Sequence, residues 1–146
     1  MFDEVWLYTD GAARGNPGPA AAGFRILGAS GELLFEHEES LGDRTNNQAE
    51  YTALILGLEA SHAYTKGRVT VGSDSKLVVH QMKGEWRVKD PELRALHTDA
   101  HAKAARFREV RYDHHPRSHA EIATVDRALN RLLDLEAQGS SPRAAV

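Results

Sequence analysis

The sequence predicts an α/β fold with a mixed five-stranded sheet, in which a three-strand antiparallel meander is joined to parallel strands and flanked by helices. Three observations predict it. The first third of the chain carries three strand-like segments with no helical segment between them. The remainder alternates helical and strand patterns, which is typical of crossover connections. The chain has 146 residues, of which 41% are hydrophobic and 27% charged, as in a single globular domain.

The meander is predicted from three strand-like segments and the turn signals between them. Residues 4–10 form the first strand, whose two faces are both largely apolar, as in a strand covered on both sides. A loop rich in Gly and Pro spans residues 11–19. Residues 20–27 and 32–39 have strand character and are separated by the turn sequence GASG, which predicts a hairpin.

Helical spacing and β-rich segments define the rest of the chain. The expected elements are a long helix from Thr45 or Asn46 to about Tyr64, a strand over 68–73, helices over 75–82 and 91–107, a strand over 109–114 and a helix over 118–137. The stripes expected to face inward are Ala49, Ala53, Leu56, Ala60 and Ala63, then Leu93, Leu96, Ala100 and Ala104, and finally Ile122, Val125, Leu129, Leu132 and Leu133. Because helices join the first, fourth and fifth strands, these three are expected to run parallel.

Composition excludes several classes of protein. Lys and Arg number 18 against 21 Asp and Glu, so no overall basic charge indicates a general nucleic-acid binder. The lack of cysteine excludes a disulfide scaffold, a thiolate metal site and a Cys nucleophile. No apolar run reaches the length of a membrane span, and the first residues do not form a secretory signal. We therefore expect a cytoplasmic domain over 1–138, followed by a flexible tail over 139–146.

Four acidic residues have positions that suggest a site. Asp10 closes the first predicted strand and Asp74 follows the fourth, so both are expected at the carboxyl edge of the sheet, where open α/β sheets place their sites. Glu50 lies one turn into the long helix, and Asp126 lies on the last helix. Each has a simpler explanation when taken alone. The Asp residues that follow strands could be turn formers or helix caps, Glu50 could be solvated, and Asp126 could pair with Arg127.

Taken together, the four acids favour a metal site. Carboxylates in close quarters raise one another's pKa, so a cation is needed to hold them ionised. Oxygen ligands without cysteine suit Mg²⁺ or Mn²⁺. Two such ions about 3.5–4 Å apart serve in-line displacement at phosphorus, one activating water and the other stabilising the leaving oxygen.

The motifs around these acids resemble those of type 1 ribonuclease H. Residues 9–19 (TDGAARGNPGP) resemble its first motif, residues 45–51 (TNNQAEY) its second, residues 72–75 (GSDS) its third and residues 126–130 (DRALN) its fourth. The resemblance implies an endonuclease that hydrolyses the RNA strand of RNA–DNA hybrids with two Mg²⁺ or Mn²⁺ ions, leaving 5′-phosphate and 3′-hydroxyl ends. The chain resembles the compact form of the family, without a basic protrusion or a hybrid-binding domain, and we expect a monomer.

The resemblance also assigns residues. Asp10, Glu50, Asp74 and Asp126 match the metal-site acids. The positions expected to contact the hybrid are Asn16, Thr45, Asn46, Asn47, Gln48 and Ser75. Side-chain amides can bind minor-groove edges and 2′-hydroxyls, which distinguish RNA from DNA. Asn46 or Asn47 could instead cap the helix, and we expect one of the pair to do so while the other contacts substrate.

The fourth motif departs from the family pattern. Counting forward from Pro116 places the acid at Thr124, whereas counting back from Asn130 places it at Asp126. We favour Asp126, although a register slip would bring Asn130 to the metals instead.

Two further segments could contact substrate. The loop before the last helix often assists product release in this family, and its candidates are His114, His115, Arg117 and His119. Trp86, Arg87 and Lys89 could contact the DNA strand in place of the basic protrusion, or Trp86 could pack on the core.

Three other functions would need a different set of residues. Another nuclease or a transposase-like enzyme of the same fold would keep the acids but not the Asn46-Asn47-Gln48 run. A non-catalytic binding module would not need all the acids. A small-molecule phosphotransferase would need a Walker-type phosphate loop, and the sequence has none.

Overall fold

The structure is a computed structural model and describes residues 1–139. Its elements are β1 (Phe2–Ala13), β2 (Gly18–Leu27), β3 (Leu33–Arg44), α1 (Asn46–Ser61), β4 (Thr65–Ser73), α2 (Lys76–Met82), α3 (Pro91–Ala104), β5 (Glu109–His114) and α4 (Ala120–Ala137). The type and order of the elements are those predicted. The tail predicted over 139–146 lies outside the described residues, apart from Gly139.

The strands form one mixed sheet of five strands in the order β3-β2-β1-β4-β5. The strand β1 is central, and it pairs antiparallel with β2 and parallel with β4. The pairs β2–β3 and β4–β5 are antiparallel and parallel, respectively. The predicted meander and the parallel arrangement of the first, fourth and fifth strands are therefore confirmed.

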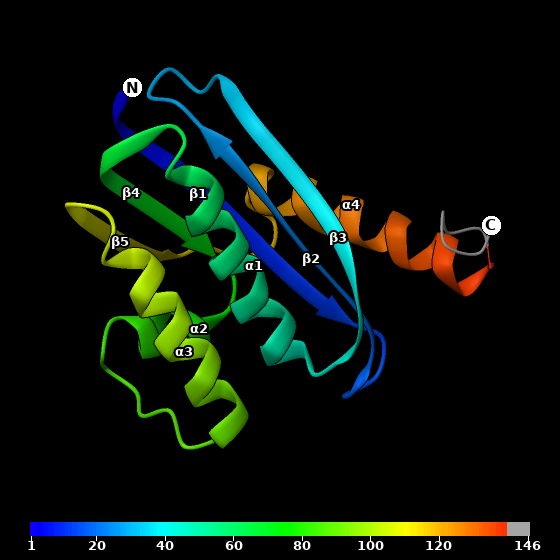
Figure 1. Cartoon of the computed structure of the whole chain (residues 1–146). Helices are drawn as coiled ribbons and strands as arrows, with labels where there is room; N and C mark the ends of the chain where they lie inside the picture. Colours follow the sequence, from blue (N-terminus) through cyan, green and yellow to red (C-terminus); the bar gives the residue numbers. More distant parts are fainter. Residues whose placement is uncertain (140–146) are drawn as a thin grey trace.

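Helices cover both faces of the sheet (Figure 1). The larger core lies between the sheet and α1 to α3, and it includes Leu7, Leu54 and Leu58. On the opposite face α4 packs through Val125, Leu129 and other residues of its predicted stripe. None of the described helices is long and apolar enough to span a bilayer.

The predicted inward stripe of α1 is only partly correct. Ala49 and Ala53 are buried, but Ala63 is exposed and lies beyond the end of the helix. The largest buried side chains of α1 include Leu54 and Leu58, which the prediction left out. The helix lies against the sheet and also contacts α3, so it is buried on more than one side and has no single apolar stripe.

Several predicted boundaries also differ. The hairpin formed by β1 and β2 extends into the predicted loop, because strand pairing continues to Ala13↔Ala20 and leaves only residues 14–17 outside the strands. The helix α1 ends at Ser61, since the chain turns there and enters β4 at Thr65. The helix α3 ends at Ala104 rather than at 107.

Candidate metal centre and nucleic-acid interface

Asp10 lies on the central strand, at the edge where the site was predicted. It pairs with Gly23 of β2 and is 3% exposed. Its Oδ2 atom is buried and has no hydrogen-bond partner among the described residues. An unpartnered buried carboxylate oxygen is costly unless something else neutralises it, and a cation is the simplest candidate.

Glu50 reaches the same edge from α1. Its Oε1 atom accepts a hydrogen bond from the backbone N–H of Gly11, and the side chain is buried. Gly11 permits this approach, because a β-carbon there would overlap the backbone of Ala49 and Glu50. A glycine directly after Asp10 is therefore what lets the first turn of α1 lie against the end of β1.

Asp74 follows β4, the parallel neighbour of β1. Its Oδ2 atom lies 3.2 Å from Nε of Arg117 in the loop before α4. The Asp74 side chain is 10% exposed and that of Arg117 is 75% exposed, so the ion pair lies at the mouth of the site. Asp74 does not cap α2. Ser75 does, and its hydroxyl accepts from the N–H of Val78.

The three carboxylates converge. Asp10, Glu50 and Asp74 each offer an oxygen, and these oxygens lie within 4.8 Å of one another. Burial raises the pKa of Asp10 above its ordinary value of 3.8, and the charges of Glu50 and Asp74 raise it further. Burial and the charge of Asp74 also raise the pKa of Glu50, while the hydrogen bond from the Gly11 N–H lowers it by a smaller amount. A divalent cation among these oxygens would relieve the repulsion that causes both shifts.

Asp126 approaches from the opposite face of the sheet, although it is not one of the three acids whose oxygens lie within 4.8 Å of one another. It is partly buried and close enough to Asp10 that its charge and its carboxyl raise the pKa of Asp10. The hydroxyl of Thr124 instead donates a hydrogen bond to the carbonyl of Ala120, one turn earlier in α4. Asn130 donates its amide to Asp126 rather than replacing it. Asp126 is therefore the member of the fourth motif that lies beside Asp10.

The N-terminus of α1 and the β1–β2 loop form a polar ledge one turn before Glu50. Thr45 is the N-cap, and its capping box with Gln48 corrects the expectation that Asn46 or Asn47 caps the helix. Asn16 Oδ1 accepts from the backbone N–H of Asn46 at 2.9 Å, which joins the loop to the helix.

The side chains of this ledge differ in how free they are. The amide of Gln48 is committed at both ends, because its oxygen accepts from Thr45 N–H and its nitrogen donates to Glu92 of α3. Asn47 is exposed, and its side chain has no hydrogen bond within residues 1–139. Asn47 is thus better placed than Gln48 to bind a ligand. The sequence did not predict the hydrogen bonds made by Glu92 and Gly11. Of the two, only Gly11 could have been noticed in the sequence, because it directly follows Asp10.

The four residues expected to assist product release from the loop before α4 make different contacts in the structure. Arg117 alone forms an ion pair with one of the acids, while His114 Nε2 lies 3.3 Å from the backbone oxygen of Asp74. His115 and His119 pack near the ring of Tyr8, and His119 caps α4. In the loop after α2, Trp86 is 46% exposed and stacks on His80, with ring centroids 4.4 Å apart. It does not pack in the core.

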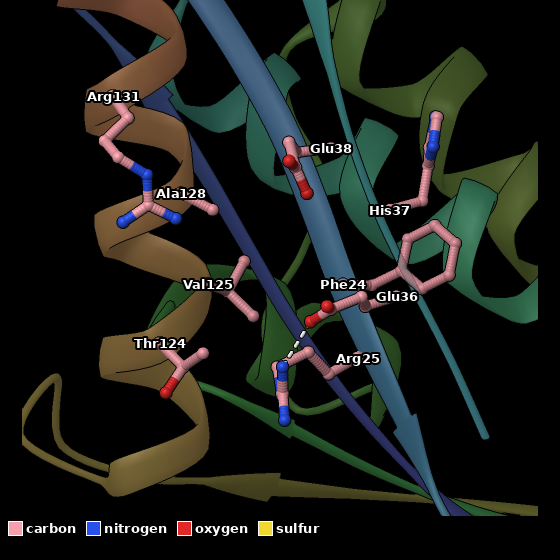
Figure 2. A pocket seen from close by; sticks show the side chains of 9 residues that line it. All are labelled: Phe24, Arg25, Glu36, His37, Glu38, Thr124, Val125, Ala128 and Arg131. Carbon is pink, nitrogen blue, oxygen red and sulfur yellow. Dashed lines mark hydrogen bonds and ion pairs between the residues drawn. The ribbon is translucent and has the colours of Figure 1, made fainter. Parts of the chain in front are cut away.

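A separate cavity of about 190 Å³ lies between α4 and the strands β2 and β3 (Figure 2). Its lining includes Arg25, Glu36 and Arg131, and Arg25 of β2 pairs with Glu36 of the neighbouring strand β3. None of Asp10, Glu50, Asp74 and Asp126 lines this cavity. The carboxylate cluster therefore does not belong to it.

A buried cluster of carboxylates at the carboxyl edge of a mixed sheet, beside a ledge of amides, defines a candidate site for phosphoryl chemistry assisted by divalent metal ions. Residues 8–125 match the family model described as reverse transcriptase-like. The chain belongs to this family and, within it, to the type 1 ribonucleases H.

Solved structures agree with this assignment. The N-terminal ribonuclease H domain of Rv2228c from Mycobacterium tuberculosis is 40% identical with a TM-score of 0.88, over 94% of this chain and 99% of that one. LC11-RNase H1, in complex with an RNA/DNA hybrid, is 35% identical with a TM-score of 0.84, over 91% of this chain and 99% of that one.

Curated sequences extend beyond the matched region. Ribonuclease HI of Halobacterium salinarum is 40% identical over 130 residues, which are 89% of this chain and 64% of that protein. The bifunctional protein Rv2228c of M. tuberculosis is 40% identical over 142 residues, or 97% of this chain, but these make up 38% of that protein. The chain thus spans less than two thirds of these relatives.

Proposed function

We propose that this protein is an endonuclease that hydrolyses the RNA strand of RNA–DNA hybrids with two divalent cations, Mg²⁺ or Mn²⁺. The observation that carries the proposal is the convergence of Asp10, Glu50 and Asp74 within 4.8 Å of one another. Relatives named ribonuclease H and a neighbour solved with an RNA/DNA hybrid support the choice of substrate.

The residues present fit divalent cations. All the donors are hard carboxylate oxygens, and the buried Oδ2 of Asp10 lacks a partner among the described residues. Asp10, Glu50, Asp74 and Asp126 would hold the ions. Two bound cations would activate the attacking water and stabilise the leaving 3′-oxygen, which gives 5′-phosphate and 3′-hydroxyl ends.

The protein's own side chains would do the rest. Asn16 and Asn46, held together by their hydrogen bond, would fix the β1–β2 loop and the α1 N-terminus as one surface for the sugar-phosphate backbone. Asn47 would bind base edges or 2′-hydroxyls with its free amide. Thr45, Gln48 and Ser75 would contribute to the same surface while holding the ends of α1 and α2. Arg117 would screen the Asp74 charge from an approaching phosphate.

Cleavage of defined substrates tests the proposal. Labelled RNA–DNA hybrid, duplex RNA, duplex DNA and each single strand would be incubated with Mg²⁺, Mn²⁺ or a chelator. We expect cleavage of the hybrid's RNA strand alone, only with a divalent ion, and products whose ends carry 5′-phosphate and 3′-hydroxyl. Cleavage of duplex DNA or of single strands at a similar rate would contradict the proposed substrate.

Two variants separate catalysis from binding. Asp10→Asn keeps the shape of the side chain but removes a charge, so we expect loss of cleavage with hybrid binding retained. Asn47→Ala keeps the acids, so we expect weaker hybrid binding and intact metal binding. Retained cleavage in Asp10→Asn would overturn the assigned role of the carboxylates.

A further inference from the structure

We propose that Asn130 and Arg14 are positioning residues that fix the orientation of the Asp126 carboxylate. The inference rests on the proposed function, since it takes Asp126 to be one of the residues that hold the cations. It concerns two side chains to which neither the motifs nor the comparisons assign this role.

Hydrogen bonds and one ion pair connect these residues in a chain. The amide nitrogen of Asn130 donates to Asp126 Oδ2 at 3.3 Å and to the Asp126 backbone oxygen at 3.1 Å. The guanidinium of Arg14 donates to the side-chain oxygen and to the backbone oxygen of Asn130, both at 3.2 Å. A second acid, Asp134, pairs with Arg14 at 2.6 Å.

The order of donors in this chain fixes which way the amide points. An asparagine amide can donate or accept at either end by turning over, but a guanidinium has donors only. With Arg14 on one side, the oxygen of Asn130 must face Arg14, and its NH₂ group must face Asp126. Arg14 and the backbone oxygen of Asp126, which only accepts, therefore favour the same orientation, in which Asp126 meets a donor rather than another oxygen.

Asp126 needs such help more than the other acids do. Asp10 is fixed on the central strand and Glu50 by the N–H of Gly11, and both are buried. Asp126 is only partly buried on a helix from the opposite face of the sheet. Asn130 engages one carboxylate oxygen of Asp126, Oδ2. Outer contacts of this kind hold a ligand in the geometry a metal requires.

The same contacts connect α4 to the polar ledge formed by the β1–β2 loop and the N-terminus of α1. Arg14 lies in the β1–β2 loop two residues before Asn16, which holds the backbone of Asn46. The loop is thus anchored to α1 on one side and to α4 on the other. The position of Asp126 is set relative to the surface on which the hybrid would lie.

The test uses Asn130→Ala, Arg14→Ala and the double variant. Arg131→Ala is the matched control, because it removes a charge from the same helix and Arg131 has no hydrogen bond to Asp126. The readouts are the Kd for Mn²⁺ by calorimetry without nucleic acid, kcat and KM on a hybrid, and their dependence on Mg²⁺ concentration. Circular dichroism confirms that each variant is folded.

We expect both single variants to weaken Mn²⁺ binding by about 10-fold or more. We also expect a lower kcat that excess Mg²⁺ recovers, with KM for the hybrid unchanged. Because Arg14 acts through Asn130, the double variant should be no worse than Asn130→Ala. Arg14→Lys, which keeps a donor, should recover part of the loss, and Arg131→Ala should behave as the wild type.

Unchanged Mn²⁺ affinity in folded Asn130→Ala would overturn the inference, as would additive losses in the double variant. These failures are distinct from failure of the proposed function. A wild type that binds Mn²⁺ but cleaves no hybrid would contradict the proposed activity, while the affinities of the variants would still decide the role of Asn130 and Arg14.

Discussion

The substitution Asp10→Asn should stabilise the metal-free protein at neutral pH. Asp10 is 3% exposed, and its carboxylate lies within 4.8 Å of those of Glu50 and Asp74. At that separation, with an effective dielectric constant of about 20, two unit charges repel each other by about 3.5 kcal/mol. The isosteric amide removes one charge from the cluster and keeps its packing.

Protonation limits the size of this effect. A folded protein can relieve the repulsion by holding a proton on Asp10, whose pKa is raised by burial and by the neighbouring acids. Holding that proton at pH 7 on a group with an ordinary pKa of 3.8 costs about 4 kcal/mol. We therefore expect Asp10→Asn to raise the free energy of unfolding by about 1–4 kcal/mol.

Thermal unfolding followed by circular dichroism, with a chelator present, measures this difference. A gain of 1 kcal/mol should raise Tm by about 2–4 °C in a chain of this size. The gain should shrink as pH falls from 7 toward 4, since a raised pKa destabilises the folded state only above the pKa of the unfolded chain. Mg²⁺ should raise Tm of the wild type more than that of Asp10→Asn.

Two results would refute this reasoning. One is a metal-free Asp10→Asn protein no more stable than the wild type at pH 7. The other is a difference in Tm that grows as pH falls, because that would mean the folded state favours the charged carboxylate.

Three more substitutions test the surrounding structure. Gly11→Ala places a β-carbon against the backbone of α1, so the free energy of unfolding, measured by denaturant, should fall by about 1–3 kcal/mol and cleavage should be lost. Wild-type activity would contradict the close approach. Tyr51→Phe removes the donor to Gln81 Oε1, so denaturant unfolding should show a loss of about 1–3 kcal/mol, and no loss would show that the buried bond is dispensable. Arg117→Ala removes the cation beside Asp74, so calorimetry should show tighter Mn²⁺ binding. The gain should be less than about 5-fold, because an exposed ion pair contributes little. Weaker Mn²⁺ binding would refute a purely electrostatic role for Arg117.

The order of elements could be predicted because the signals are local. The largely apolar run of the β1 region, the turn near Gly28 and the helical spacing of α4 each depend on neighbouring residues. Ile122, Val125, Leu129 and Leu133 were predicted to face inward and are buried. This stripe is clear because α4 packs on one side only.

Errors arose where burial depends on more than one neighbour. The helix α1 contacts both the sheet and α3, so spacing alone could not identify Leu54 and Leu58 as its core. The hairpin continued into the predicted loop because pairing of Ala13 with Ala20 outweighs the local preference of glycine and proline for turns.

The sequence by itself determined the kinds of residue available to the site. Asp10, Glu50, Asp74 and Asp126 are hard oxygen donors, and no cysteine competes with them. Their motifs also indicated the family.

Only the tertiary structure decided which atoms meet. Parallel pairing of β1 with β4 brings the ends of two distant strands together, Gly11 lets Glu50 approach, and Arg14 turns the amide of Asn130 toward Asp126. Such contacts join residues far apart in the chain, and their geometry depends on backbone packing and on the direction of hydrogen-bond donors, neither of which is encoded in local periodicity.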